Sequence, residues 1–381
     1  MMMGLKNRFC VDFNCEIPMH PTINGKPTKP LLTQSVVDRA MEDNPYRATR
    51  EYYNIFDKNG GTDCIVGRDV IRRNERMYLP VFGNEGKPNA HYGLFWDPAP
   101  KVDNSFVLIG EFIPDEQEGF RCRLVNGINM VNYLPNGEKS PMRYTDQVKY
   151  FRKLMVAYNG NAPDWENIHI FVDPGAGGQG SAILDELMED FVDDNGVKHC
   201  GVIDMEDDFY KEMKPKVPNA KEGVIRAWSA QKFKNAMYES TESVLTKDLI
   251  TFMVTPPRNK KLELEEGKMY TLTKEQLRAM LEIDLVKEEF LLMRKTKTEN
   301  GNIRFALTPE KQRTASDDRA YTLAALSFYL FQLLRDERFK QKKNKQDLSI
   351  LYKGAGTSQK KVSPFGGGTN PFGRKGATIG R

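Results

Sequence analysis

A short apolar segment that ends in an aspartate and a glycine-rich turn constrains this chain more than any other feature. The segment 168–172 reads Ile-His-Ile-Phe-Val, which predicts a buried strand. Asp173 follows directly, and four glycines lie between residues 174 and 180, ahead of a helical pattern. A strand does not need a carboxylate at its end, whereas a hard cation at the edge of a sheet does, and glycines let a ligand come close. We therefore expect Asp173 to bind metal.

Two other acidic positions have related settings. Asp97 ends a second apolar strand, and Asp317 and Asp318 open a long helix with an apolar face. Taken singly, an Asp-Pro turn explains Asp97, and helix capping by Ser316 with a favourable helix dipole explains the acidic pair. Taken together they favour a metal site, because clustered carboxylates need a partner cation.

The order of these acids, on an early strand, a later strand and a late helix, is typical of ribonuclease H-like metal nucleases. In such a site two divalent ions, roughly 3.5–4 Å apart, hold the attacking water and the leaving oxygen of a phosphodiester. The predicted elements agree with that fold class. They are three strands (94–96, 105–112 and 121–131), a helix from residue 145, the strand at 168–172 and a helix at 182–191. We therefore predict an α/β fold, a ribonuclease H-like mixed sheet flanked by helices.

At these residues the chain resembles a known family, the nuclease part of the large terminase subunit of tailed bacteriophages, which packages and cuts viral DNA. The similarity runs from about residue 35 to about residue 335. Many terminases carry a further aspartate three residues after the acidic pair, but Tyr321 stands there, so no fourth ligand is expected from that turn. The matching segments are Asn44–Arg47 with Glu51–Tyr53, Trp96–Ala99, Asp173 with its glycine turn, and Asp317–Tyr321.

The resemblance implies a metal-dependent endodeoxyribonuclease that cuts double-stranded DNA during phage genome packaging. Asp97, Asp173 and one or both of Asp317 and Asp318 would be catalytic and would hold two Mg²⁺ or Mn²⁺ ions. The implied partners are double-stranded DNA, a small terminase subunit, an ATPase segment and the portal. The implied location is the host cytoplasm, with a transient stay at the portal of the procapsid.

The chain lacks the phosphate-binding motif GxxxxGK[ST] of an ATPase. A terminase motor would therefore carry its ATPase part either in a missing preceding portion or in a separate chain. We expect residues 1–80 to form a connecting region at the end of that missing part, and residues 81–338 to form the nuclease domain. The basic, glycine-rich composition of residues 339–381 predicts a disordered tail.

The positive charge of the chain is concentrated at its end. From Lys340 onward ten Lys or Arg stand against one acid, so of the formal net charge of +4 this tail carries +9 and the remainder −5. An acidic body needs metal ions or a local basic feature to approach DNA. An Asn-Gly turn at residues 300–301 predicts a β-hairpin just before the acidic helix. We expect its cations to contact DNA, and they are Arg294, Lys295, Lys297 and Arg304.

The composition points to a reducing compartment. No apolar stretch is long enough to cross a bilayer, and the start of the chain lacks the apolar core of a secretory signal. Five irregularly spaced cysteines form no disulfide framework, which favours a cytoplasmic protein.

Two other functions stay open at this point. A transposase or junction resolvase would share the fold, but it usually brings its own DNA-binding domain, and none is evident. A non-catalytic DNA-binding virion or scaffold protein would not need its acids, yet all three acid positions are filled.

Overall fold

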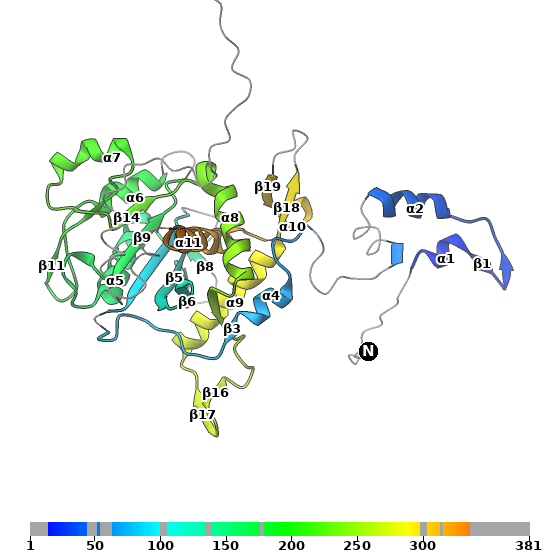
Figure 1. Ribbon diagram of the computed structural model, residues 1–381, viewed down its shortest axis with the longest axis horizontal. Coiled ribbons are helices and arrows are strands. Elements are labelled where there is room, and N and C mark those ends of the chain that lie inside the picture. The colour runs from blue at the N-terminus through cyan, green and yellow to red at the C-terminus, as the bar shows by residue number, and fades with distance from the viewer. Residues whose placement is uncertain are drawn as a thin grey trace, which may run out of the picture.

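A seven-stranded mixed sheet forms the centre of the protein in the computed structural model, with the strand order β14-β9-β4-β5-β6-β15-β3 (Figure 1). The structure describes residues 14–43, 52–53, 63–87, 89–99, 105–133, 139–175, 179–297, 303–312 and 315–335. The strands are β3 (Glu75–Arg76), β4 (His91–Asp97), β5 (Phe106–Asp115), β6 (Gly119–Asn129), β9 (Ile168–Val172), β14 (Ile225–Ala227) and β15 (Ile250–Met253).

The connections between these strands give a ribonuclease H-like topology. β4, β5 and β6 form an antiparallel meander. The chain then crosses over, and β9 pairs parallel with β4 on the other side, followed by β14, which pairs parallel with β9. A three-stranded meander followed by the crossover strand β9 is the order that the sequence predicts, so the expected fold class is confirmed. The second crossover strand, β14, was not predicted.

The other edge of the sheet is completed by two parallel strands, β15 beside β6 and β3 beside β15. β3 and the preceding helix α4 (Arg68–Arg73) lie in the segment that the sequence assigned to the connecting region. This stretch packs against the sheet, and its side chains Ile65, Val66 and Ile71 are buried in the main core.

Helices cover both faces of the sheet, so its central strands are buried on both sides. Phe95 and Phe171 lie in one core, and Trp96 and Val172 lie in the other, as the alternation of side chains along a strand requires. The first face carries α8 (Ala230–Thr246), α9 (Lys274–Leu292) and α11 (Asp318–Arg335), and the second carries α5 (Tyr144–Asn159) and α6 (Gln179–Leu187).

The helix α11 is the most deeply enclosed of these elements. It contacts β4 and β5 on one side and α8 and α9 on the others. Every residue from Arg319 to Leu330 is buried. A helix covered on all sides can be apolar all round, which explains why its sequence goes beyond a single apolar stripe.

Two local predictions can be compared directly with the structure. Thr273-Lys-Glu-Gln276 has the sequence pattern of a capping box, and the structure confirms it. Thr273 Oγ1 accepts from the Gln276 amide at 3.2 Å, and Gln276 Oε1 accepts from the Thr273 amide at 2.9 Å. The helix predicted at 182–191 begins and ends earlier, as α6, and Phe191 opens the short strand β10 (Phe191–Val192) instead.

The hairpin expected after residue 292 is present. It consists of β18 (Met293–Lys297) and β19 (Ile303–Leu307), which pair antiparallel. The Asn300-Gly301 turn that would join these strands lies outside the described residues, as do the Asn44–Arg47 motif and the tail from residue 336.

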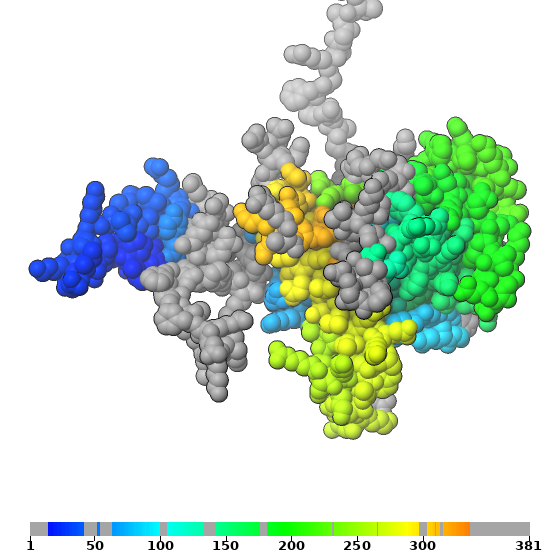
Figure 2. Space-filling model, turned by 180° about the vertical axis from the view of Figure 1, so that it is seen from behind, coloured from blue at the N-terminus to red at the C-terminus, as the bar shows by residue number. Residues whose placement is uncertain are grey.

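The remaining elements are short. The β16–β17 hairpin projects from the body (Figures 1 and 2). In the described ranges, no helix combines the length and apolarity needed to span a bilayer. The remaining elements are α1 (Glu16–Met19), β1 (Thr22–Ile23), β2 (Lys26–Pro27), α2 (Gln34–Asp43), β7 (Val131–Tyr133), β8 (Lys139–Pro141), a 3₁₀ turn (Pro163–Trp165), β11 (Lys198–His199), β12 (Val202–Ile203), α7 (Asp208–Met213), a second 3₁₀ turn (Lys214–Lys216), β13 (Lys221–Glu222), β16 (Lys261–Glu265), β17 (Lys268–Thr271) and α10 (Pro309–Gln312).

Candidate functional site

Asp97 and Asp173 stand at the ends of two neighbouring parallel strands. β4 and β9 pair in a register that places Trp96 opposite Val172, and the Asp173 amide donates to the Trp96 carbonyl oxygen at 3.1 Å. Side chains alternate along a strand, so Asp97 points to the same face as Phe95, which is the face that carries α11. The carboxylates expected to act together therefore lie at one edge of the sheet and on one side of it.

Hydrogen-bond donors surround the Asp173 carboxylate. Oδ1 accepts from the Gly175 amide at 2.9 Å, and the Ala230 amide and the Tyr321 hydroxyl lie within hydrogen-bonding reach of the carboxylate. Burial raises the pKa of Asp173 above its ordinary value, while these donors and the nearby Lys234 oppose that rise. Gly175 has a φ of +70°, which glycine adopts without strain, so the first glycine of the turn shapes the loop that delivers this amide.

The acidic pair lies at the start of α11. The Asp318 amide donates to Ser316 Oγ at 3.2 Å, and the Tyr321 amide donates to the Asp317 carbonyl oxygen at 2.7 Å, so Asp317 rather than Ser316 stands at the N-cap position. Asp317 Oδ2 binds Lys234 Nζ at 2.9 Å.

Tyr321 connects α11 to the strand-end carboxylate. Its hydroxyl donates to the Trp228 carbonyl oxygen at 2.8 Å and also lies within hydrogen-bonding reach of Asp173. A phenol has one proton, so it serves one of these acceptors at a time. Burial raises the pKa of Tyr321 well above its usual range, and the charges of Asp173 and Asp97 raise it further, so the group stays a donor.

Tyr238 of α8 shows that the acids from separate elements converge. Burial raises the pKa of its phenol well above the ordinary value, and the negative charges of Asp317, Asp97, Glu289 and Asp318 add to that rise. The pKa of one buried phenol is thus raised by carboxylates from β4, α9 and the start of α11. Asp97, Asp317 and Asp318 therefore lie within electrostatic reach of one ring on α8, and this neighbourhood, with Asp173, is called the acidic centre below.

A buried ion network fixes the first turn of α11. Arg319 is only 5% exposed and binds Glu282 at 2.8 Å and Glu289 at 2.6 Å. Burial raises the pKa of Glu289, while Arg319 opposes the rise. Both glutamates belong to α9, so the network ties α11 to α9 directly beside Asp318.

The ligand chemistry of this centre fits a hard divalent cation. Its donors are carboxylate oxygens, which Mg²⁺ and Mn²⁺ prefer. In the part of the chain that the structure describes, no three His, Cys, Asp or Glu side chains are gathered closely enough to form a ligand group. Asp317 is paired with the Lys234 ammonium instead, so a positive charge already lies among these carboxylates.

The cations of the predicted DNA-binding hairpin are not equivalent. Lys295 Nζ binds Glu242 at 2.9 Å, and Arg294 Nε lies 3.4 Å from Asp63. Arg304 is exposed, and the side chain of Lys297 lies outside the described residues. The ion pairs partly compensate Arg294 and Lys295, so Arg304 is better placed to meet a phosphate.

Sequence reasoning missed the contribution of α8. Ala230, Lys234 and Tyr238 recur every four residues, so they share one face of the helix. That face meets Asp173, Asp317 and the other acids. A lysine one turn ahead of a buried tyrosine was the available signal. That pattern indicates a functional lysine only when α8 is known to pack against α11.

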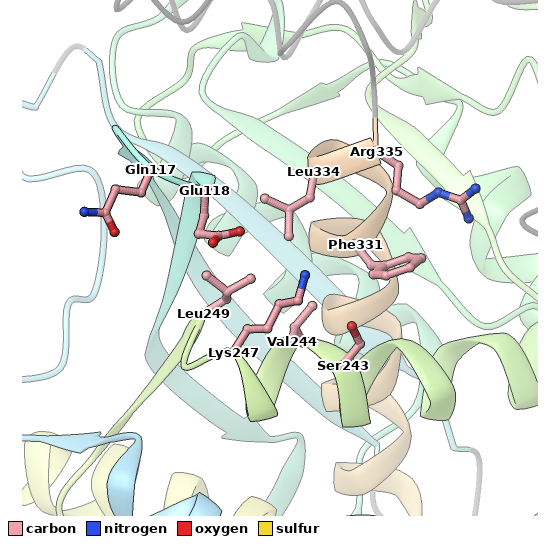
Figure 3. Close-up of a pocket in the computed structure, with 9 residues that line it drawn as sticks. All are labelled: Gln117, Glu118, Ser243, Val244, Lys247, Leu249, Phe331, Leu334 and Arg335. Atoms are coloured by element: carbon pink, nitrogen blue, oxygen red, sulfur yellow. The ribbon is translucent and has the colours of Figure 1, made fainter.

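A pocket at the other end of α11 is separate from this centre. It is bordered by Glu118, Lys247, Phe331 and Leu334 (Figure 3). Phe331 lies 13 residues after Asp318 on α11, so about 20 Å of helix separates this pocket from the acidic pair.

The chain is similar in structure to solved phage terminase nucleases. One is the large terminase nuclease from thermophilic phage G20c, with 12% identity, a TM-score of 0.37, and coverage of 69% of this chain and 96% of that one. The same nuclease with bound magnesium matches with 12% identity and a TM-score of 0.37 over 71% of this chain and 98% of that one. The large terminase of another thermophilic bacteriophage, in complex with ADP, matches with 11% identity and a TM-score of 0.36 over 80% of this chain and 53% of that one. No protein-family model matches this chain, and no curated protein matches it significantly.

Proposed function

We propose that this protein is a metal-dependent endonuclease that hydrolyses phosphodiester bonds of double-stranded DNA. The observation that carries the proposal is the placement of Asp97 and Asp173 at adjacent strand ends, facing the helix that begins with Asp317 and Asp318. Carboxylates that converge in this way repel one another unless a cation joins them. Two Mg²⁺ or Mn²⁺ ions are the proposed cofactors.

The proposed role of each acidic residue follows from the element that carries it. Asp97 and Asp173, on the rigid sheet, would hold the ions, with Asp317 and Asp318 completing the set from the helix. Bound divalent ions supply a water of lowered pKa and stabilise the departing oxygen. Tyr321 and the Gly175 amide orient the Asp173 carboxylate, which fixes the direction of its remaining lone pairs.

The proposed substrate is DNA bound through its backbone, with little reading of sequence. Arg304 on β19 offers an exposed cation in the hairpin that leads toward the start of α11. Contacts to phosphates dominate nonspecific affinity. By its resemblance to terminases, the protein would act in genome packaging in the host cytoplasm, with an ATPase segment, a small subunit and the portal as partners.

The test is cleavage of supercoiled plasmid in Mn²⁺, with and without EDTA. We expect nicked and linear products in Mn²⁺ and none in EDTA. Binding without any cutting would instead support a non-catalytic DNA-binding protein. Products confined to one sequence or to branched DNA would support a transposase or a junction resolvase.

A further inference from the structure

Lys234 places a positive charge inside the acidic centre. Its Nζ lies 2.9 Å from Asp317 Oδ2, and its side chain is 33% exposed. This ion pair joins α8 to the residue directly before α11, so it connects two elements that are far apart in the sequence.

The face of α8 that carries Lys234 also contacts the other acids. Ala230 lies one turn earlier and donates its amide to Asp173, while Tyr238 lies one turn later among the acids of β4 and α11. Lys234 therefore binds the carboxylate before the helix and lies near the carboxylate at the strand end. Its charge acts on both, since it opposes the rise in the pKa of Asp173.

Two neighbouring cations have other roles. Arg319 is bound between Glu282 and Glu289, so that network keeps a net charge of −1. Lys232 is exposed, and its ammonium lies 5.1 Å from the centre of the Phe233 ring. Lys232 thus offers a matched comparison, since it has the same charge and lies on the same helix two residues away.

We propose that Lys234 is a built-in counter-cation that holds Asp317 and competes with a divalent ion for that carboxylate. A metal coordinates an oxygen at about 2.0–2.6 Å, so it cannot take Asp317 Oδ2 while the ammonium stays in place. Lys234 is then a positioning residue that sets how tightly the centre binds its ion. The inference rests on the proposed function, because it requires Asp317 to be a ligand.

The first experiment measures Mn²⁺ binding by isothermal titration calorimetry in the full chain. In the wild type, a metal ion must first break the partly exposed Lys234–Asp317 ion pair. Lys234→Met removes that pair, so its Kd for Mn²⁺ should be about two- to fivefold lower than that of the wild type. Lys232→Met should bind like the wild type. Lys234→Arg, which keeps the charge, should not show the gain. An unchanged or higher Kd in Lys234→Met would overturn the proposal.

The second experiment compares melting temperatures in EDTA and in Mn²⁺. Without metal, Lys234→Met should melt about 1–3 °C lower than the wild type, since the carboxylates lose a counter-charge. Mn²⁺ should then raise its melting temperature by more than it raises that of the wild type. Equal shifts in both proteins count against competition.

The outcomes separate this inference from the proposed function. Mn²⁺ binding by the wild type with no change in Lys234→Met removes the inference alone. No binding by either protein removes both. Binding by Lys234→Met but not by the wild type would be the strongest support for a competing lysine.

Discussion

The backbone amide of Asp173 donates a hydrogen bond to the carbonyl oxygen of Trp96 at 3.1 Å. This hydrogen bond extends the parallel pairing of β4 and β9 by one residue beyond Val172, where β9 ends. Asp97 and Asp173 therefore leave neighbouring strands at the same level, and such strands lie about 4.8 Å apart. The spacing of the two carboxylates is thus set by sheet register, before any metal binds.

Asp173→Asn should abolish plasmid cutting and leave the fold intact. Asparagine keeps the shape and most of the hydrogen bonds, but it removes the charge that a divalent ion needs. Loss of several kcal/mol of metal-derived stabilisation corresponds to a fall in rate of about a hundredfold or more. Nicking of supercoiled plasmid in Mn²⁺ measures this, with circular dichroism as the control for folding. Cutting at the wild-type rate would show that Asp173 is not a ligand.

Tyr321→Phe should weaken metal binding more than it weakens the fold. The variant loses a hydroxyl that binds the Trp228 carbonyl and reaches Asp173. Losing an orienting partner of a ligand typically costs about tenfold or more in metal affinity. The free energy of unfolding should fall by about 1 kcal/mol. Calorimetry measures the Kd for Mn²⁺, and urea unfolding measures the free energy of unfolding. An unchanged Kd would show that Tyr321 does not orient a metal ligand.

The sequence was sufficient to predict four strands of the sheet, β4, β5, β6 and β9, and the aspartates that end two of them. Two local features of the sequence were enough for this. The apolar runs before Asp97 and Asp173 indicate buried strands, and an acid directly after a buried strand indicates a functional carboxylate. The cap at Thr273 was equally local. The fold class followed from the order of the elements.

Contacts that depend on packing could not be predicted in this way. Lys234 reaches Asp317 across 83 residues of sequence, and Arg319 reaches Glu282 across 37. Such pairs depend on how α8, α9 and α11 are placed against one another. The hairpin shows the same limit, since its charge pattern did not reveal that Glu242 binds Lys295.

Arg319→Met should be strongly destabilising. It would leave Glu282 and Glu289 buried without their partner, which costs about 3–5 kcal/mol. Arg68→Met is the matched control, because its pair with Glu288 is exposed and is worth no more than about 1 kcal/mol. Urea unfolding at pH 7 measures both. At pH 5 the cost in Arg319→Met should shrink, since an unpaired buried glutamate takes up a proton. Equal small losses in both variants would contradict a buried network.

His91 should make the protein less stable in mild acid. Burial lowers the pKa of His91 from 6.5 to about 4. Between these values the unfolded chain binds more protons than the folded one, so stability is complete above pH 6.5 and falls as the pH drops toward 4. A shift of this size corresponds to about 3 kcal/mol. His91→Gln should therefore lose less stability than the wild type between pH 7 and pH 4.5. Parallel unfolding curves across that range would show that His91 does not titrate there.

Arg304→Ala should weaken DNA binding and flatten its dependence on salt. Each lost phosphate contact removes about one unit from the slope of log affinity against log salt concentration. Lys295→Ala should have a smaller effect, because Glu242 already binds that ammonium. Fluorescence anisotropy with a duplex at several salt concentrations separates the two. Equal slopes in the wild type and Arg304→Ala would place the DNA contact elsewhere.

The strand β3 has a consequence for any shortened form of the protein. Asn74 and Arg76 accept hydrogen bonds from the amides of Phe252 and Val254, at 3.0 and 3.1 Å. A protein that begins at residue 81 would leave these amides of β15 without partners along an open sheet edge. Open edges pair with other molecules, so such a fragment should self-associate even though it keeps all four candidate aspartates. A soluble fragment of the protein should therefore keep α4 and β3 and begin before Arg68, upstream of all four candidate aspartates.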